Sequence, residues 1–227
     1  MAIEAVLLSY VIDGMESRDV ATIDIPGAFM QADMEDVVHM KLEGKMAELL
    51  VRIDPKPYRK EHVQMQVRKQ VFYVELKKAL YGTLKAALLF WKKLTTKLKQ
   101  WGFEVNPYNW CVMNKTIDGA QCTILWHVDD LKISHVKPNV VTKVIKQLEA
   151  EFGIESPLTK TRGKVHEYLG MILDFTTPGK VMVLMKDFIE RMLNELPTDM
   201  DGEAVTAAAN HLFEVNETDP IKLNEEP

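Results

Sequence analysis

Long apolar runs, cysteines and basic leader residues are all scarce in this sequence. No stretch of its 227 residues approaches the ~20 consecutive apolar residues that a membrane-spanning helix needs. The first ten residues are apolar but include Glu4 and no basic residue, which argues against a secretory signal peptide. The two cysteines, Cys111 and Cys122, form no C-x-x-C or metal-binding spacing. We therefore expect an intracellular protein that is not secreted and has no membrane partner.

Basic residues are fewer than acidic ones, 28 against 33, and they are unevenly distributed along the chain. The hydrophobic content of 47% is that of a globular protein, and the net charge of −5 by itself argues against a nucleic-acid binder. From Asp187 onward, eleven acidic residues face only two basic ones, a net charge of −9 that leaves +4 on residues 1–186. We expect a mildly basic domain over 1–196 and an acidic, poorly ordered tail or linker over 197–227.

Apolar periodicity predicts an α+β fold, an antiparallel sheet with helices packed on one face. A short helical turn is expected at 28–32, and a basic, proline-bearing connection at 54–69. The other predicted elements are strands 19–25, 37–42, 71–76, 111–114, 123–128, 131–134, 168–173 and 181–184 and helices 3–12, 84–101, 138–152 and 187–196.

The helix predicted over 84–101 has two different faces. One face carries apolar residues at helical spacing: Leu84, Leu88, Trp91, Leu94, Leu98 and Trp101. The other carries Lys85, Lys92, Lys93, Lys97 and Lys99. These lysines are either a solvated helix face or a stripe that contacts phosphates. Gly102 is expected to end the helix.

Two adjacent carboxylates, Asp129 and Asp130, stand between two short strand-like runs. The pattern predicts a β-hairpin with both aspartates in its turn, where Asp is common because its side chain bonds nearby backbone. A solvated turn is the simplest interpretation. The alternative is a divalent metal site, since a cation relieves the repulsion between two close carboxylates. Asp24 ends a predicted strand just before Pro26-Gly27, so it is the best candidate for a third ligand.

Four sequence blocks, in the same order, resemble the reverse transcriptases of copia/Ty-type LTR retrotransposons. The resemblance covers roughly residues 10–196. The blocks are D-I-P-G-A-F-M-Q-A-D-M at 24–34 with V-H-M-K at 38–41; L-K-K-A-L-Y-G at 76–82 with Leu84, Lys85 and Trp91; H-V-D-D at 127–130, similar to a Y-V-D-D box; and Y-L-G-M at 168–171.

The resemblance implies a right-hand polymerase palm with two Mg²⁺ ions, for which Mn²⁺ could substitute. Asp24 and Asp129 would be the direct ligands, Asp130 an auxiliary one, and the Ile25 carbonyl a further donor. By the same resemblance, Phe29 would be the steric gate that excludes a ribose 2′-hydroxyl. Lys85 would lie among the residues that bind the nucleotide. The alternatives are that Asp24 is a helix N-cap and that Phe29 is an ordinary core aromatic.

The blocks also depart from the family pattern. His127 stands where the family usually has Tyr, and an ordinary strand histidine is the favoured interpretation. Where the family typically has Y-G-L-K-Q-A-P, Thr83 is an extra residue, Ala86 replaces Gln and Leu88 replaces Pro. Only 23 residues precede Asp24, so an N-terminally truncated domain that lacks most of the fingers and any RNase H region is expected.

These observations lead to two main hypotheses. The first is a partial RNA-directed DNA polymerase that binds a primed RNA or DNA template and a dNTP, with the remainder of a retrotransposon polyprotein as a further partner. The second is an inactive relic or domesticated nucleic-acid-binding module with the palm fold. An unrelated metal-binding α+β protein is a third interpretation, and a structure with Asp24 far from Asp129 would favour it.

Overall fold

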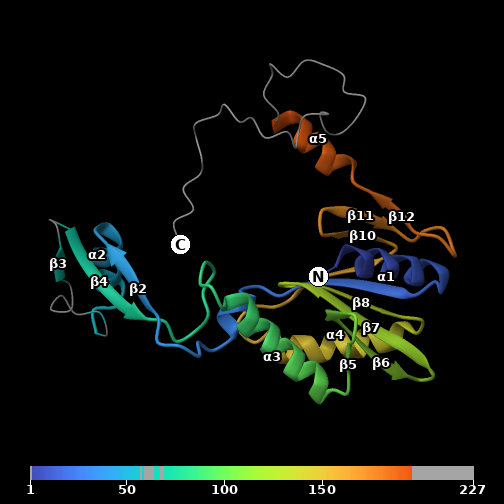
Figure 1. The fold of residues 1–227 in the computed structure, drawn as a ribbon, viewed down its shortest axis with the longest axis horizontal. Helices are drawn as coiled ribbons and strands as arrows, with labels where there is room; N and C mark the ends of the chain where they lie inside the picture. The colour runs from blue at the N-terminus through green and yellow to red at the C-terminus, as the bar shows by residue number, and fades with distance from the viewer. Residues whose placement is uncertain (1, 57, 59–63, 67–68, 196–227) are drawn as a thin grey trace, which may run out of the picture. The chain divides into compact units, whose positions relative to one another are not determined.

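The computed structural model describes residues 2–56, 58, 64–66 and 69–195 (Figure 1). The chain divides into two compact units, Met1–Met185 and Lys186–Pro227. The described part of the second unit is helix α5 (Lys186–Glu195), which agrees with the helix predicted at 187–196. The acidic tail predicted at 197–227 lies outside the described residues. Among the described helices, none is long and apolar enough to cross a membrane.

A six-stranded antiparallel sheet forms the centre of the first unit. Its strand order is β5-β6-β7-β8-β1-β9. Strand β1, near the start of the chain, therefore lies between two strands from its second half. The strands are β5 (Glu104–Asn106), β6 (Asn109–Ile117), β7 (Ala120–His127), β8 (Asp130–His135), β1 (Asp19–Asp24) and β9 (Thr159–Gly163). The mixed fold and the antiparallel sheet confirm the prediction from sequence.

Helices cover both faces of this sheet. Side chains such as Ala21 and Ile133 pack with α3 (Ala86–Gln100) and α4 (Pro138–Phe152). Val20 and Leu125, which alternate with them, pack with α1 (Ile3–Met15) on the opposite face (Figure 1). The prediction of helices on one face only is therefore wrong. Strand β1 is buried along both faces from Val20 to Ile23, which is typical of a strand in the middle of a covered sheet.

Several elements follow the sequence pattern closely. The short turn at 28–32 is a 3₁₀ helix, η1 (Ala28–Gln31). The turn between β6 and β7 contains Asp118 at φ 52° and Gly119 at φ 82°, as a type I′ hairpin turn requires. Helix α4, which matches the range predicted, buries Val140, Val141, Val144, Leu148 and Phe152 at helical spacing.

The buried face of helix α3 overlaps only in part with the one predicted, and Trp91 and Trp101 are half-buried against the core. Leu94 and Leu98 are buried as expected, but Leu88 is exposed and Leu84 is fully exposed before the helix begins. The face that enters the core is instead made of Ala86, Leu89, Phe90, Leu94, Thr95 and Leu98. Gly102 ends the helix as predicted, at φ 84°. The Phe103 and Gly102 amides donate to the Leu98 and Lys99 carbonyls at 3.0 and 2.9 Å, a Schellman arrangement.

Two smaller antiparallel sheets complete the first unit. One contains β2 (His39–Glu43), β4 (Lys69–Glu75) and β3 (Gln64–Gln66), with helix α2 (Lys45–Ile53) beside it. The other contains β10 (Val165–Tyr168), β11 (Met171–Asp174) and β12 (Met182–Leu184). Strands β3, β5, β9 and β10 and helix α2 were not predicted. The single strand predicted at 168–173 is divided by a turn at Leu169-Gly170. Half of the connection predicted at 54–69 lies outside the described residues, and the described half includes β3.

Candidate active site

The carboxylates singled out in the sequence meet at one edge of the central sheet. Strands β1 and β8 are antiparallel neighbours, and Asp24 lies directly opposite Asp130 in their register. Asp129 belongs to the turn before β8, and its carbonyl accepts a hydrogen bond of 3.2 Å from the Ile25 amide. This bond fixes the end of β1 against the turn. The structure therefore brings together Asp24, Ile25, Asp129 and Asp130, segments separated by about a hundred residues.

The β7–β8 turn consists of Val128 and Asp129 and not of the two aspartates. Asp130 is the first residue of β8 and pairs with His127 as well as with Asp24. Val128 has φ 59°, a left-handed conformation that is unfavourable for a β-branched side chain. The cross-strand pair of His127 and Asp130 leaves only two residues for the turn, which explains the error in the sequence prediction. Strain of this kind persists only where the surrounding structure holds it in place.

The electrostatic field at this edge favours a cation. Burial raises the pKa of Asp24, and the charge of Asp129 raises it further. Burial also raises the pKa of Asp130, with smaller contributions from Asp129 and Asp24, while His127 acts in the opposite direction. The charged forms of Asp24 and Asp130 are thus destabilised by burial and by neighbouring carboxylates, and a bound cation would relieve the repulsion.

The donor set fits a hard divalent ion. Carboxylate and carbonyl oxygens, which Asp24, Asp129, Asp130 and Ile25 supply, are the ligands that Mg²⁺ prefers. Within the described residues, no three His, Cys, Asp or Glu side chains are already grouped in a metal-binding arrangement.

Tyr81 is a residue of this site that the sequence analysis did not select. Its hydroxyl donates a hydrogen bond of 3.1 Å to Oδ2 of Asp129. Its ring lies against that of Phe29, with centroids 4.3 Å apart and planes inclined by 34°. Tyr81 precedes Gly82 inside the second of the four blocks. Its place in that block is the sequence signal that could have identified it.

Phe29 is held in place by both the core and the site. Gly27, at φ 63°, turns the chain after β1 and starts η1, which carries Phe29. The Phe29 side chain is 9% exposed and belongs to the same apolar cluster as α3 and α4. Its packing against Tyr81 places it at the boundary between that cluster and the carboxylates. Both interpretations of Phe29, gate and core aromatic, agree with this position.

Tyr168 supports the strand that carries Asp130. Its hydroxyl donates to the backbone carbonyl of Asp130 at 3.2 Å, and its ring packs edge-on against Tyr10 of α1. Tyr168 lies at the end of β10, next to the Leu169-Gly170 turn. The Y-L-G-M block therefore reaches the same edge of the sheet as the aspartates.

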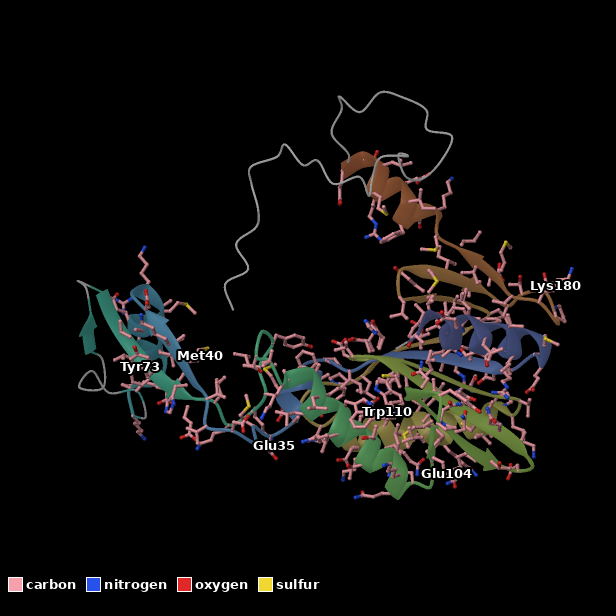
Figure 2. All side chains as sticks on the ribbon, viewed as in Figure 1. Glu35, Met40, Tyr73, Glu104, Trp110 and Lys180 are labelled. Carbon is pink, nitrogen blue, oxygen red and sulfur yellow. The ribbon has the colours of Figure 1, made fainter. Side chains whose placement is uncertain are left out.

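Four of the five lysines predicted on this helix have partners within the chain. Lys85 lies 2.5 Å from Asp36, and Lys92 lies 2.9 Å from Glu35, which Figure 2 labels. Lys93 donates to the Gln31 carbonyl at 2.7 Å, and Lys97 lies 3.0 Å from Glu151. Exposed pairs such as those of Lys85 and Lys92 contribute little to stability. They nevertheless show that these ammonium groups have acidic partners before any phosphate is present.

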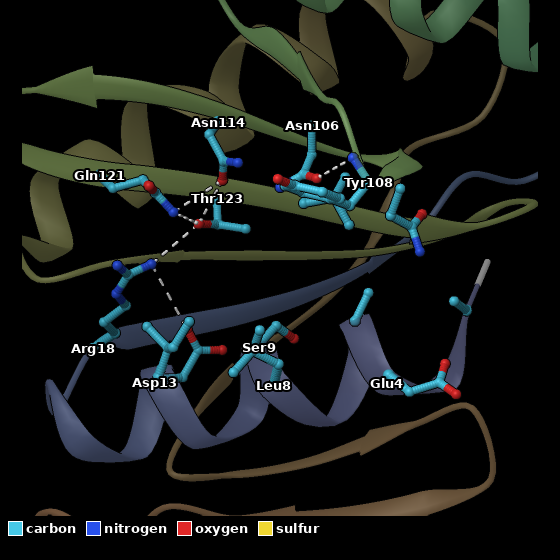
Figure 3. Close-up of a pocket in the computed structure, with 15 residues that line it drawn as sticks. Glu4, Leu8, Ser9, Asp13, Arg18, Asn106, Tyr108, Asn114, Gln121 and Thr123 are labelled. Carbon is cyan, nitrogen blue, oxygen red and sulfur yellow. Dashed lines mark hydrogen bonds and ion pairs between the residues drawn. The ribbon is translucent and has the colours of Figure 1, made fainter.

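A separate cavity lies on the other face of the sheet. It has a volume of about 360 Å³ and is lined by α1 and by residues of the β5–β7 region (Figure 3). Arg18 donates to Thr123 at 3.2 Å, and Gln121 bridges Thr123 and Asn114 at 3.0 and 3.1 Å. None of the predicted site residues lines this cavity. It is therefore distinct from the carboxylate edge.

Comparisons with known proteins agree with the four blocks. Residues 1–207 match the family described as "Reverse transcriptase (RNA-dependent DNA polymerase)". The Saccharomyces cerevisiae protein named "Putative transposon Ty5-1 protein" is 21% identical over 173 residues, which are 76% of this chain and 49% of that protein. The chain thus spans about half the length of this curated relative.

Two solved telomerase structures show a more distant similarity. Apo telomerase from Candida tropicalis, with a truncated C-terminal domain, has a TM-score of 0.44 and 9% identity, covering 79% of this chain and 39% of the telomerase chain. Telomerase from Candida albicans, in complex with a fragment of telomeric RNA, has a TM-score of 0.40 and 7% identity, covering 78% and 34%. Both scores are too low to establish a shared fold.

Proposed function

The chain belongs to the reverse transcriptase (RNA-dependent DNA polymerase) family, and from this premise we propose that it is the palm region of a copia-type retrotransposon enzyme. The proposed reaction is nucleotidyl transfer from a dNTP to the 3′-hydroxyl of a primer on an RNA or DNA template. The register that puts Asp24 opposite Asp130, with Asp129 bonded to Ile25, carries this proposal. A palm domain over 1–196, followed by an acidic tail, belongs to the same proposal.

Asp24 and Asp129 are the proposed direct ligands of two Mg²⁺ ions, with Asp130 as an auxiliary ligand and the Ile25 carbonyl as a further donor. Mn²⁺ could substitute because it also takes oxygen ligands. Divalent ions bound there would neutralise the charge that develops on the attacking and leaving oxygens. The raised pKa values of Asp24 and Asp130 support this assignment, because they indicate a site where negative charge is uncompensated.

The transfer forms one bond and breaks another. The primer 3′-oxygen attacks the α-phosphorus of the dNTP, the bond from the α-phosphorus to the bridging oxygen breaks, and pyrophosphate leaves with that electron pair. The proton of the 3′-hydroxyl passes to solvent. Phe29 would form the wall that excludes a 2′-hydroxyl, a case of specificity obtained by a clash with the wrong substrate. Lys85 would reach the triphosphate after leaving Asp36.

Primer extension tests the proposal. Full-length chain is incubated with oligo(dT) annealed to poly(rA), dTTP and Mg²⁺ or Mn²⁺. Asp129→Asn is expected to lower the rate by at least ~10³-fold, because the main carboxylate ligand loses its charge. Asp118→Asn is the matched control, since Asp118 occupies the other hairpin turn of the same strand. Extension by Asp129→Asn at the rate of Asp118→Asn would rule out the assigned metal site.

The second candidate is a nucleic-acid-binding module without turnover. The pairing of Lys85 with Asp36, and the Ala86 side chain where the family typically has Gln, favour it. This candidate predicts that binding of a labelled RNA–DNA duplex is the same for wild type and Asp129→Asn. It also predicts no extension with either metal. Extension by wild type would exclude it.

A further inference from the structure

The hydroxyl of Tyr81 has an unusual place in the site. It donates to a carboxylate oxygen of Asp129, the residue proposed above as a direct metal ligand. Asp24 also acts on this hydroxyl electrostatically, so the group lies in the field of both proposed ligands. A cation bridging Asp24 and Asp129 would need the same region. A hydroxyl proton is a weak substitute for such a cation, since it neutralises only part of the carboxylate charge.

The backbone around Tyr81 is built to hold it there. The Thr83 amide donates to the Leu80 carbonyl at 3.0 Å, which closes a turn with Tyr81 and Gly82 in its centre. Gly82 has φ 90°, as the third residue of a type II turn requires. The Thr83 hydroxyl donates to the same Leu80 carbonyl at 2.7 Å. Thr83 is the residue that is extra relative to the family pattern, and here it closes the turn that presents Tyr81.

The ring of Tyr81 connects this hydrogen bond to the proposed gate. At 4.3 Å between centroids, the rings of Tyr81 and Phe29 are in direct contact. Phe29 is 9% exposed and fixed in the core, whereas Tyr81 is 49% exposed and attached to a turn. Tyr81 is therefore the partner that has room to move. A rotation that releases Asp129 would also uncover one side of Phe29.

We propose that Tyr81 is a positioning residue that holds Asp129 while the site is empty and is displaced when a divalent cation binds. This inference rests on the proposed metal site, and it adds a competition between the Tyr81 hydroxyl and the cation. The cation would compete with the Tyr81 hydroxyl for Oδ2 of Asp129. Because the Tyr81 ring also packs against Phe29, displacement of Tyr81 by a cation would change the wall that the two rings form.

Mn²⁺ binding by the full chain tests the competition without any turnover. Free Mn²⁺ is followed by electron paramagnetic resonance in wild type, Tyr81→Phe and Tyr108→Phe. Tyr81→Phe keeps the ring and removes the donor, so we expect about fivefold tighter binding. Tyr108→Phe is the matched control, because Tyr108 is 95% exposed and lines the separate cavity, away from the carboxylates. Its Mn²⁺ affinity should equal that of wild type.

Unchanged or weaker binding by Tyr81→Phe would overturn the inference, and weaker binding would make Tyr81 a supporting group for the ligand. Asp129→Asn separates this failure from that of the proposed function. If Asp129→Asn binds Mn²⁺ as wild type does, the metal site itself is wrong. If it loses binding while Tyr81→Phe matches wild type, only the role of Tyr81 is wrong.

A second readout uses the unmodified protein and does not depend on the folding of any variant. Displacement moves the phenol of Tyr81 from a carboxylate to solvent, which changes its near-ultraviolet absorption. Titration of wild type with Mg²⁺ should give a tyrosine difference spectrum that saturates with metal binding. A flat difference spectrum at saturating metal would contradict displacement.

Discussion

Two hairpin turns of the same sheet, one at each end of β7, differ in how well their residues suit their backbone. The β6–β7 turn uses Asp118-Gly119, both at positive φ, a pair that adopts this conformation readily. The β7–β8 turn places Val128 at φ 59°, where a β-branched residue is strained. The first turn connects β6 and β7, and its Asp118 lies 3.3 Å from Lys137. The second carries Asp129 and lies beside Asp24, Phe29 and Tyr81.

The difference suggests that the second turn was not selected for stability. A residue such as Asn or Gly at position 128 would suit the backbone better. The carboxylates of Asp24 and Asp130, beside this turn, also lower the stability of the folded state. Burial and mutual repulsion both act against their charged forms. Proteins typically accept such local costs at functional sites. Experiments on the two turns and their neighbours test this difference.

After the loss expected for Asp129→Asn, the largest effect is expected at Phe29, the aromatic residue beside the strained turn. If Phe29 is the gate, Phe29→Val should raise incorporation of rTTP relative to dTTP by about 10- to 100-fold, because the 2′-hydroxyl gains space. Phe103→Val is the control: Phe103 is equally part of the core cluster, at 3% exposure, but is not among the site residues. Steady-state primer extension with each nucleotide gives the ratio. Equal ratios for both variants would leave Phe29 as a core aromatic.

Substitutions in the two turns should change stability in opposite directions. Gly119→Ala is expected to lower the free energy of unfolding by about 1–2 kcal/mol, because alanine is disfavoured at positive φ. Val128→Asn is expected to raise it by about 1 kcal/mol, because Asn tolerates the left-handed region. Urea denaturation of both variants measures the change. A loss of stability in Val128→Asn would mean that the packing of Val128 outweighs the strain.

The smallest effect concerns pH. The folded pKa of Asp130 lies above its ordinary value, so the folded state binds its proton more tightly than the unfolded state does. Stability therefore falls as pH rises from the ordinary carboxyl pKa of 3.8 through the raised value. Asp130→Asn removes this contribution. In EDTA, the free energy of unfolding of Asp130→Asn minus that of wild type should therefore be larger at pH 7 than at pH 4.

Urea midpoints at the two pH values, with and without Mg²⁺, provide the measurement. Added Mg²⁺ should stabilise wild type more than Asp130→Asn, because it neutralises the charge that the variant lacks. A constant difference between wild type and Asp130→Asn from pH 4 to 7 would contradict the assigned origin of the shift.

Features that depend on residues close together in the chain could be predicted from the sequence. The Asp118-Gly119 turn, the buried stripe of α4 and the end of α3 at Gly102 follow from turn chemistry and helical periodicity, which act over a few residues. The family followed from four blocks in order, because each block is a short run whose residues are read directly.

The contacts between distant segments depend on the tertiary structure. Pairing with Asp24 and His127 puts Asp130 in a strand and leaves the turn to Val128. Tyr81 reaches Asp129 across 48 positions of sequence, a contact that no local pattern encodes. The coverage of both sheet faces has the same cause, since α1 packs on strands that lie far from it in the chain. Such contacts depend on strand order and register, which are set by the packing of the whole domain.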